Sequence, residues 1–415
     1  MPTTTVYLDN HATTQVDPRV VTAMLPYFTR VYGNAGSSGH SFGWEARDAV
    51  EASREVVARA INALPRCIVF TSGATESNNL AIRGVSERHR RRGNHLVSVV
   101  TEHKSVLDPL ARMARRGFEV TLVGVRADGC RDAGSPDLDA LAAAIRDDTL
   151  LVSVMLANNE IGVVAPLRAI ASLCEARGVL LHCDATQAIG KLPVDVHELG
   201  VDLLSLSAHK IYGPKGVGAL YVRRGEKPVR LEPLMDGGGQ EGGLRSGTLN
   251  VPGIVGFASA IGLCQSEGAA ESARLRQLRD RLYAGLTARI DGVALNGPSL
   301  DDPALRLPGN LNCSFGGVDG EALMMNMRDV AVSSGSACTS TNPEPSHVLR
   351  ALGIDPDRVR SSLRFGLGRF NTADEIDFAV SSIAETVRRL RQLGGQRFLA
   401  QANSGELKAS SENPK

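Results

Sequence analysis

The strongest constraint on the fold of this chain is a series of short apolar runs that alternate with helical segments between residues 67 and 223. The runs occupy 67–73, 95–100, 118–125, 150–158, 178–186, 202–210 and 218–224. A strand that is apolar along its whole length is buried on both faces of its sheet. Alternation of such strands with helices is typical of a mostly parallel sheet covered on both sides. The chain is therefore predicted to have an α/β fold.

A second, smaller unit is expected after this pattern ends. The glycine-rich stretch 235–250 is followed by a long helical region, 251–290, a second run of strands and helices, and a final helix from about residue 372. We expect a large domain over 17–259 and a smaller α/β domain built from 1–16 and 260–396. The last residues, 397–415, are polar and are expected to form a tail.

Composition excludes several classes of protein. The chain has 415 residues and a net charge of +1, which allows two domains but gives no basic face for direct nucleic-acid binding. No apolar run reaches the roughly 18 residues of a membrane span, and the start lacks the profile of a signal peptide. The 7 cysteines are an odd count without C-x-x-C spacing, so neither a disulfide framework nor a zinc site is expected. A reducing, cytoplasmic setting fits this pattern.

Polar residues gather where the expected strands end, which is where ligands bind in sheets of this kind. Lys210 follows one apolar run, Asp184 ends another and His103 follows a third. A lysine amine can form a Schiff base, a carboxylate can pair with a protonated pyridine nitrogen, and an imidazole can stack on a flat ring. Taken singly, each residue has an ordinary alternative: a surface lysine, an aspartate that caps a helix or binds a metal, and a structural histidine.

The stretch TSGATES, residues 71–77, joins a strand end, a glycine turn and a helix start. The backbone amides of Ala74 and Thr75 would point at an anion such as a phosphate. An ordinary helix cap by Ser72 or Thr75 is an equally good alternative for this stretch alone. Together with the lysine, aspartate and histidine, in this order and all at strand ends, the stretch predicts a pyridoxal phosphate site.

Two further residues stand apart from the other candidates. Cys338 lies in a stretch rich in Ser, Gly, Thr and Pro, about 332–346, which is typical of a mobile loop. A cysteine in such a loop can act as a thiolate nucleophile, with an incidental exposed thiol as the alternative. Arg364 lies within an apolar segment, where its guanidinium can bind a carboxylate through two hydrogen bonds or extend to the surface.

The chain resembles the cysteine desulfurases that supply sulfur for iron–sulfur clusters, within the class V aminotransferase group and its long-loop members. The resemblance spans about residues 6 to 371 and implies the type I fold of pyridoxal-phosphate-dependent aminotransferases. The runs that carry it are YLDNHATT, FTSGATESNNLAI, TEHKSVLD, NNEIGVV, HCDATQAIGKLP, SLSAHKIYGPKGVGALYVRR, GGGQEGGLRSGTLN, AVSSGSACTS and SLRFGLGRF.

The resemblance implies a role for each residue around the cofactor ring. Lys210 would be the Schiff-base lysine, and Asp184 would pair with the pyridine nitrogen. Gln187 would hydrogen-bond the ring oxygen, and Asn159 would also contact the cofactor. His103 would stack on the ring and assist proton transfer.

The resemblance also implies a phosphate site and a homodimer. Ala74, Thr75, Ser207 and His209 would hold the phosphate within one chain. Thr248 matches a residue that, in the family, reaches the phosphate from the other subunit of a dimer.

The implied reaction converts L-cysteine to L-alanine. Arg364 would bind the substrate carboxylate, with Asn34 nearby. Removal of the α-proton by Lys210 and attack of Cys338 on the substrate sulfur would leave a persulfide on the enzyme. Sulfur-acceptor proteins, such as an iron–sulfur scaffold or a relay protein for tRNA thiolation, would then take the sulfur. No intrinsic metal site is expected, although Cys338 is able to ligate a transient cluster on a scaffold partner.

Other functions remain open from the residues alone. An aminotransferase or a selenocysteine lyase shares the fold, but a transaminase has no use for a loop cysteine. A catalytically silent partner would have lost Lys210, Asp184 or Cys338, and all three are present. The chain departs from the family at His11 and at Ala208, where many relatives have glycine. Its last residues differ from the scaffold-docking end of the family.

Overall fold

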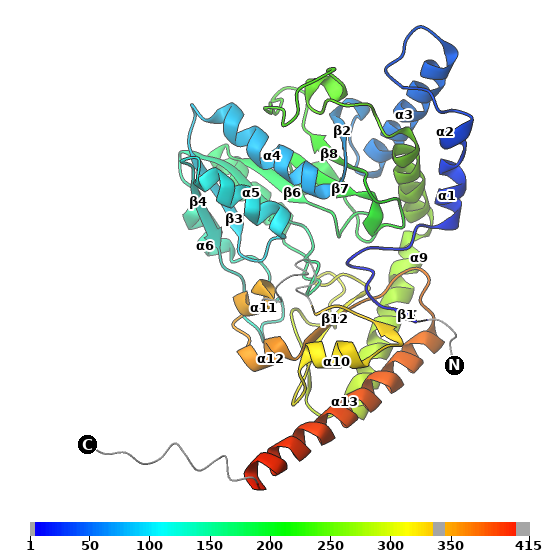
Figure 1. Ribbon diagram of the computed structural model, residues 1–415. Helices are drawn as coiled ribbons and strands as arrows, with labels where there is room; N and C mark the ends of the chain where they lie inside the picture. Colours follow the sequence, from blue (N-terminus) through cyan, green and yellow to red (C-terminus); the bar gives the residue numbers. More distant parts are fainter. Residues whose placement is uncertain (1–4, 335–344, 404–415) are drawn as a thin grey trace.

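The computed structural model describes residues 5–334 and 345–403 and shows a large sheet and, beyond a long helix, a smaller unit with two small sheets (Figure 1). The segment that contains Cys338 lies outside the described residues. The larger sheet has seven strands in the order β2-β8-β7-β6-β5-β3-β4. Their bounds are β2 Ile68–Thr71, β3 His95–Val99, β4 Glu119–Val123, β5 Thr149–Met155, β6 Leu180–Asp184, β7 Leu203–Ser207 and β8 Gly218–Val222.

The predicted α/β fold with a mostly parallel sheet is confirmed. Among the described strands of this sheet, β8 runs antiparallel to both of its neighbours, and the other ladders between neighbours are parallel. Because β2 and β7 both pair antiparallel with β8, they run in the same direction as the rest. The carboxyl ends of six strands therefore meet at one edge.

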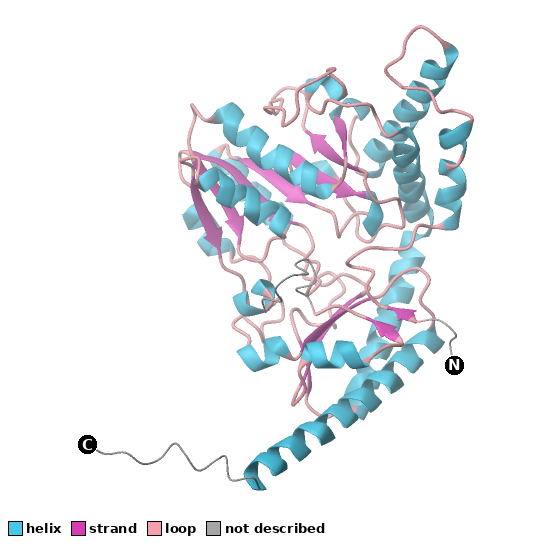
Figure 2. Cartoon of the chain, viewed as in Figure 1, coloured by secondary structure: helices cyan, strands magenta, loops and turns pink. Residues whose placement is uncertain are grey.

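Side chains of the strands alternate between two apolar clusters, which explains why the runs are apolar throughout. In β3, Leu96 belongs to the cluster on one face, whereas Val97 and Val99 belong to the cluster on the other. Helices cover both faces of the sheet (Figure 2). One face is covered by α4 (Ala74–His89) and α5 (Lys104–Ala114). The other is covered by α3 (Ser41–Ala60), α6 (Leu138–Ala144), α7 (Leu167–Arg177) and the first half of α9 (Val251–Arg289).

The smaller unit is built on a three-stranded antiparallel sheet in the order β12-β10-β9 and a parallel pair, β1 with β11. The second half of α9 and α13 pack against these strands. The bounds are β1 Val6–Tyr7, β9 Val293–Leu295, β10 Asn310–Phe315, β11 Val330–Ala331, β12 Ser362–Gly366, α10 Gly320–Asn326, α11 His347–Ala351, α12 Pro356–Arg360 and α13 Ala373–Asn403. The remaining helices are α1 Pro18–Met24, α2 Pro26–Thr29, α8 Val196–Leu199, η1 Pro65–Cys67, η2 Ala208–Lys210 and η3 Glu241–Gly243.

Helix α9 joins the two units. Its residues up to Cys264 belong to the core of the large sheet, and its residues from Leu275 belong to the core of the small one. The expected boundary between 259 and 260 thus falls within a continuous helix. Helix α13 runs to Asn403, so the first residues of the expected polar tail are helical. No described helix is both long and apolar enough to cross a membrane.

His182 is a fully buried polar residue in the centre of the large sheet. Its Nδ1 lies 2.8 Å from the Ser153 hydroxyl and its Nε2 lies 3.0 Å from the Ser205 hydroxyl. Both ring nitrogens are therefore satisfied in the neutral form, as buried polar groups usually are. Burial lowers the pKa of His182 from its ordinary value to about 4.

This shift predicts an acid-sensitive contribution of His182 to stability. In the unfolded chain the imidazole gains a proton at about pH 6.5, so stability is lost as pH falls from there to about 4, by at most about 3 kcal/mol. The variant His182→Gln, measured by denaturant unfolding at several pH values, should show a shallower loss than the wild type. The exposed His197→Gln is the control and should follow the wild type. Parallel curves for wild type and His182→Gln would contradict the assignment.

Candidate active site

A cavity of about 550 Å³ opens at the edge where the parallel strands end. Strands β2, β5, β6 and β7 contribute Ser72, Met155, Asp184 and Ser207 at or just beyond their carboxyl ends. The structure brings most of the predicted site residues together here. Those that line the cavity are Ala74, Thr75, His103, Asn159, Asp184, Gln187, Ser207, His209, Lys210 and Arg364.

Two predicted residues are not brought to this cavity, and a third cannot be placed. The described residues that line it do not include Asn34 or Thr248, and both are exposed on the single chain. Asn34 lies in the loop before α3, where its side chain accepts a hydrogen bond from the backbone of Gly36 at 2.9 Å. Cys338 lies outside the described residues.

Lys210 lies just beyond the carboxyl end of β7, and hydrogen bonds hold its amine. It donates hydrogen bonds to the backbone carbonyls of His11 and Ala12, both at 2.6 Å. The segment that carries these carbonyls is itself fixed to the same turn, because the Thr14 backbone N–H donates to the His209 carbonyl at 2.9 Å. The N-terminal segment therefore forms one wall of the cavity around the lysine.

Tyr212, two residues after Lys210, has a φ of 65°, a conformation that L residues rarely adopt. Its backbone N–H donates to the Thr14 hydroxyl at 2.8 Å, and its carbonyl accepts from the Asp17 backbone at 2.9 Å. Its ring lies 4.2 Å beneath the guanidinium of Arg369, and its hydroxyl accepts from the Arg369 backbone N–H at 2.6 Å. These contacts hold the turn at Tyr212 in its unfavourable backbone conformation.

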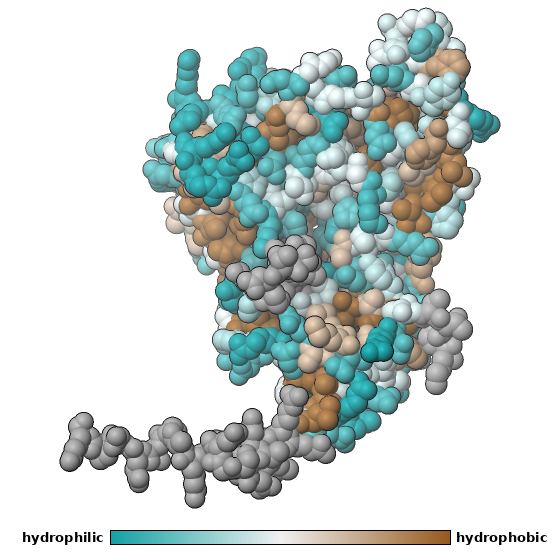
Figure 3. All heavy atoms as spheres, in the orientation of Figure 1, coloured by the Kyte–Doolittle hydropathy of each residue, from teal (hydrophilic) through white to brown (hydrophobic). Residues whose placement is uncertain are grey.

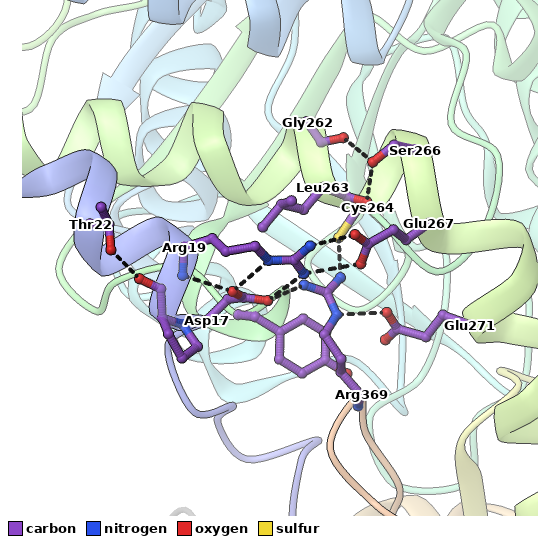
Figure 4. Close-up of polar contacts among 12 residues, drawn as sticks. Asp17, Arg19, Thr22, Gly262, Leu263, Cys264, Ser266, Glu267, Glu271 and Arg369 are labelled. Carbon is purple, nitrogen blue, oxygen red and sulfur yellow. Dashed lines mark hydrogen bonds and ion pairs between the residues drawn. The ribbon is translucent and has the colours of Figure 1, made fainter.

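Arg369 belongs to a buried ionic cluster that ties the two units together (Figure 4). It pairs with Asp17 at 2.9 Å and with Glu271 of α9 at 2.8 Å. Asp17 also pairs with Arg19 at 2.8 Å. Hydrogen bonds from Arg19, and then from Arg369, lower the pKa of Asp17 although burial opposes this. The cluster links the start of α1, the middle of α9 and the loop after β12.

Asp184 and His103 are oriented by shared neighbours. The Asn78 amide donates to the Asp184 carboxylate at 2.8 Å and to the Ser105 hydroxyl at 2.9 Å. The Ser105 backbone N–H donates to Nδ1 of His103 at 3.1 Å, so Nδ1 is the acceptor and a neutral imidazole carries its hydrogen on Nε2. Burial lowers the pKa of His103, which favours this neutral form.

The opposite end of the cavity suits an anion. Helix α4 starts at Ala74, so its free N–H groups and helix dipole face the cavity. Gly218 allows the close approach of β8 here, because a Cβ on it would lie 2.4 Å from the Leu206 carbonyl oxygen and 2.7 Å from Gly73 Cα. Burial, and then the charge of Lys210, lower the pKa of His209 to about 4, so its imidazole is neutral at pH 7.

Arg364 reaches the cavity from β12 of the smaller unit. Its side chain is 3% exposed and pairs with Asp9 at 2.8 Å. A further nitrogen, Nη1, donates to the Asn159 carbonyl at 3.3 Å. A guanidinium held on two sides in this way presents its remaining N–H groups in a fixed direction, which suits a carboxylate.

Several buried polar atoms around the cavity have no hydrogen-bond partner among the described residues. They include Nε2 of His11, Oγ1 of Thr186 and Nε of Arg364. Buried groups of this kind normally have partners, so a polar ligand in the cavity fits them. Sequence reasoning missed Thr186 as a site residue and treated His11 as a minor departure, although both lie inside motifs that were singled out. No group of three or more metal-binding side chains occurs within the described part of the chain.

A family model supplies the class of protein. The model for aminotransferase class-V matches residues 6–378, so the chain belongs to the class-V aminotransferase family. This family uses pyridoxal phosphate, and the donors around the cavity fit that cofactor: a lysine amine, a carboxylate and an anion site on a helix start. The predicted family and cofactor are confirmed.

One relative and two solved structures show which members of the family this chain is similar to. The chain is 58% identical over 389 residues, 94% of each chain, to "Cysteine desulfurase IscS" of Anaeromyxobacter sp. (strain Fw109-5). A solved structure titled "NIFS-LIKE PROTEIN" has a TM-score of 0.85 at 37% identity and covers 93% of this chain and 100% of that one. Another, "SspA in complex with cysteine", has a TM-score of 0.77 at 34% identity and covers 89% of this chain and 100% of that one.

The ionic cluster predicts a strong effect of Arg369 on stability. In the variant Arg369→Met, the largely covered Glu271 loses its partner and the buried Asp17 loses one of two, which should lower the free energy of unfolding by about 3 kcal/mol. Arg281→Met is the matched control, because its pair with Asp377 is exposed to solvent and should contribute much less. Equal denaturation midpoints for the two variants would contradict a stabilising role of the ionic cluster.

Proposed function

We propose that this chain converts L-cysteine to L-alanine and holds the released sulfur as a persulfide on Cys338. The protein is a pyridoxal-phosphate-dependent cysteine desulfurase. The observation that carries the assignment of roles is the convergence of Lys210, Asp184 and His103 on one cavity whose far end suits a phosphate. None of these side chains needs to move far to meet a single ring.

The cofactor would be held by residues from several strand ends. Lys210 would tether it, Asp184 would pair with its ring nitrogen, and Gln187 and Asn159 would contact its polar edge. The phosphate would lie on the start of α4, with these ligands: Ala74, Thr75, Ser207 and His209. When bound, pyridoxal phosphate supplies an electron-withdrawing ring that accepts charge from the substrate α-carbon.

Two groups would move protons. The Lys210 amine lies between the carbonyls of His11 and Ala12 and would take the α-proton of the substrate. Nδ1 of His103 accepts from the Ser105 backbone N–H, and His103 lines the cavity. Its Nε2 is therefore the nitrogen that would exchange protons with the substrate. Arg364, fixed by Asp9, would bind the substrate carboxylate.

The sulfur would be transferred by Cys338. Its thiolate attacks the substrate sulfur, a sulfur–sulfur bond forms, and the carbon–sulfur bond breaks with its electron pair left on the substrate. The substrate carbon then takes up protons and becomes the methyl group of alanine. The persulfide is passed on to a sulfur-acceptor protein of a reducing, cytoplasmic compartment. The free cysteines among the described residues agree with such a setting.

Both ends of the segment that contains Cys338 lie beside the cavity. Before it, the Arg364 backbone N–H donates to the Ser333 carbonyl at 2.7 Å. After it, Nε2 of His347 lies 3.0 Å from the carbonyl oxygen of Glu102, the neighbour of His103. Cys338 follows Ser333 by five residues, and five residues span at most roughly 18 Å. This short tether supports delivery of the thiol to the substrate.

The test separates the nucleophile from the cofactor site. Purified protein with pyridoxal phosphate and L-cysteine should form alanine, and Cys338→Ala should lower the rate at least about a hundredfold, because it removes the attacking group. The variant should keep the visible absorption of the bound cofactor, whereas Lys210→Ala should lose the tethered form. Alanine and the mass of the Cys338 peptide are measured.

Cys130→Ala is the control, because Cys130 is the partly exposed thiol among the described cysteines. It should retain full activity and full persulfide loading. Unchanged turnover in Cys338→Ala would contradict the role of Cys338, and a protein that takes up no pyridoxal phosphate would contradict the whole assignment.

A homodimer completes the proposal. Thr248 is exposed on the single chain, and its proposed contact is the phosphate bound by a second copy. Large apolar side chains are exposed from α1 through the start of α3, on the side of α1 and α2 where Figure 3 shows hydrophobic patches. They are Leu25, Phe28, Tyr32, Phe42 and Trp44. An exposed apolar surface of this kind is typical of an interface.

The dimer is tested by the double variant Phe28→Glu with Trp44→Glu. Charges in a buried interface should weaken self-association at least about a hundredfold, and loss of the partner's Thr248 should weaken cofactor binding as well. Sedimentation measures the mass and spectroscopic titration measures cofactor affinity. Met325→Glu, at a side chain 78% exposed in α10, is the control. A double variant with the mass of a dimer would contradict this interface.

A further inference from the structure

Two side chains, those of Lys191 and His11, contact Gln187 and take part in no step described above. The amine of Lys191 lies 2.9 Å from Oε1 of Gln187, and Nδ1 of His11 lies 3.3 Å from the same oxygen. The Gln187 amide nitrogen donates to the backbone carbonyl of His11 at 2.9 Å. These contacts form one connected group, Lys191–Gln187–His11, next to Lys210.

The chemistry of the partners fixes the orientation of the Gln187 amide. The His11 carbonyl only accepts, so the amide atom that faces it must be the nitrogen, and the atom that faces Lys191 is then the oxygen. That oxygen only accepts, so Nδ1 of His11 must carry the hydrogen, and Nε2 of His11 is left as an acceptor. Burial, and then the charges of Lys191, Arg364 and Lys210, lower the pKa of His11 well below its ordinary value, which agrees with this neutral tautomer.

One amide hydrogen of Gln187 remains for the cavity. The first is used by the His11 carbonyl, and Gln187 itself lines the cavity together with Lys210. Lys191 lies on the other side of Gln187: it lines a separate groove of about 1210 Å³ between α9 and the segment 189–194. Of the described residues that line the cavity, Lys191 is not one. Lys191 therefore makes no direct contact with the cavity: its hydrogen bond reaches it through Gln187, and its charge acts on Lys210 from a distance.

We propose that Lys191, with His11, is a positioning residue that locks the Gln187 amide with its N–H toward the cavity and so stabilises negative charge on the ring oxygen of the cofactor. This inference rests on the proposed function, which puts that ring oxygen beside Gln187. Without Lys191 the amide oxygen keeps only its 3.3 Å contact with Nδ1 of His11, so the amide is held less firmly with its N–H toward the cavity. The lock therefore keeps the N–H end of this amide toward the cofactor.

The amine of Lys191 changes its protonation state near neutral pH. Burial, and then the charge of Lys210, lower the pKa of Lys191 to about 7. A protonated amine donates more strongly than a neutral one. The lock is therefore strongest below pH 7 and weaker above it. The titratable and charged groups that face Lys191 are His11, Lys210, Cys264, Glu271 and Arg364.

The variant Lys191→Met tests the lock, because it keeps the length of the side chain without the donor or the charge. The pH-dependent visible absorption of the bound cofactor should titrate about one pKa unit higher than in the wild type, and cofactor affinity should fall about tenfold. The loss of affinity should be larger at pH 6 than at pH 9. Lys191→Arg, which restores a donor and a charge, should recover most of the wild-type titration.

Lys227→Met is the matched control, since it makes the same change at an exposed lysine far from the cavity. It should leave the titration and the affinity unchanged. A Lys191→Met protein that titrates like the wild type, while the wild type forms alanine from L-cysteine, would overturn the lock and leave the proposed function standing. A wild type that binds no pyridoxal phosphate would overturn both.

A second measurement needs no variant and guards against one that fails to fold. The rate at which an acylating reagent modifies Lys191 in the cofactor-free wild type is followed by peptide mass against pH. Half-maximal reaction near pH 7 is expected. Half-maximal reaction near the ordinary lysine value of about 10.4 would overturn the pH dependence assigned to the lock.

Discussion

The site depends on the hydrogen bonds that hold the N-terminal segment across the carboxyl edge of the large sheet. Carbonyls of His11 and Ala12 accept from Lys210, and the backbone of Asp17 donates to Tyr212. Since Asp17 also pairs with Arg369, the same segment joins the lysine turn to the smaller unit. Arg364 lies five residues before Arg369, so this connection also sets where a carboxylate is bound relative to the amine.

Each of the polar side chains Arg364, Asp184 and Gln187 has protein partners and also borders the cavity, where a ligand would bind. Asp9 takes one edge of Arg364, and the two oxygens of Asp184 each accept one hydrogen bond, from the Asn78 amide and from the Thr186 backbone N–H. Lys191 and His11 take the oxygen of Gln187. Partners of this kind cost little reorganisation when a ligand binds, because the donors already point in the needed direction.

Local sequence predicted most of the elements and most of the cavity. The apolar runs became strands, and the residues expected at their ends, such as Asp184 and Lys210, line one cavity. Asn34 and Thr248 do not, and a single chain gives them no route to it. Cys338 lies outside the described residues, so its role stays a prediction. The joining of two cores by α9 was not predicted, because one continuous helix pattern carries no mark of where its partners change.

The sequence by itself determined the chemical groups and their positions at strand ends, because strand length and apolar period are local properties. Only the tertiary structure decided how those groups are held. His11 meets Gln187 and Asp17 meets Arg369 across long stretches of chain, and no local pattern encodes such pairs. The balance of charge on Lys191 follows from burial beside Lys210, which arises only when the chain has folded.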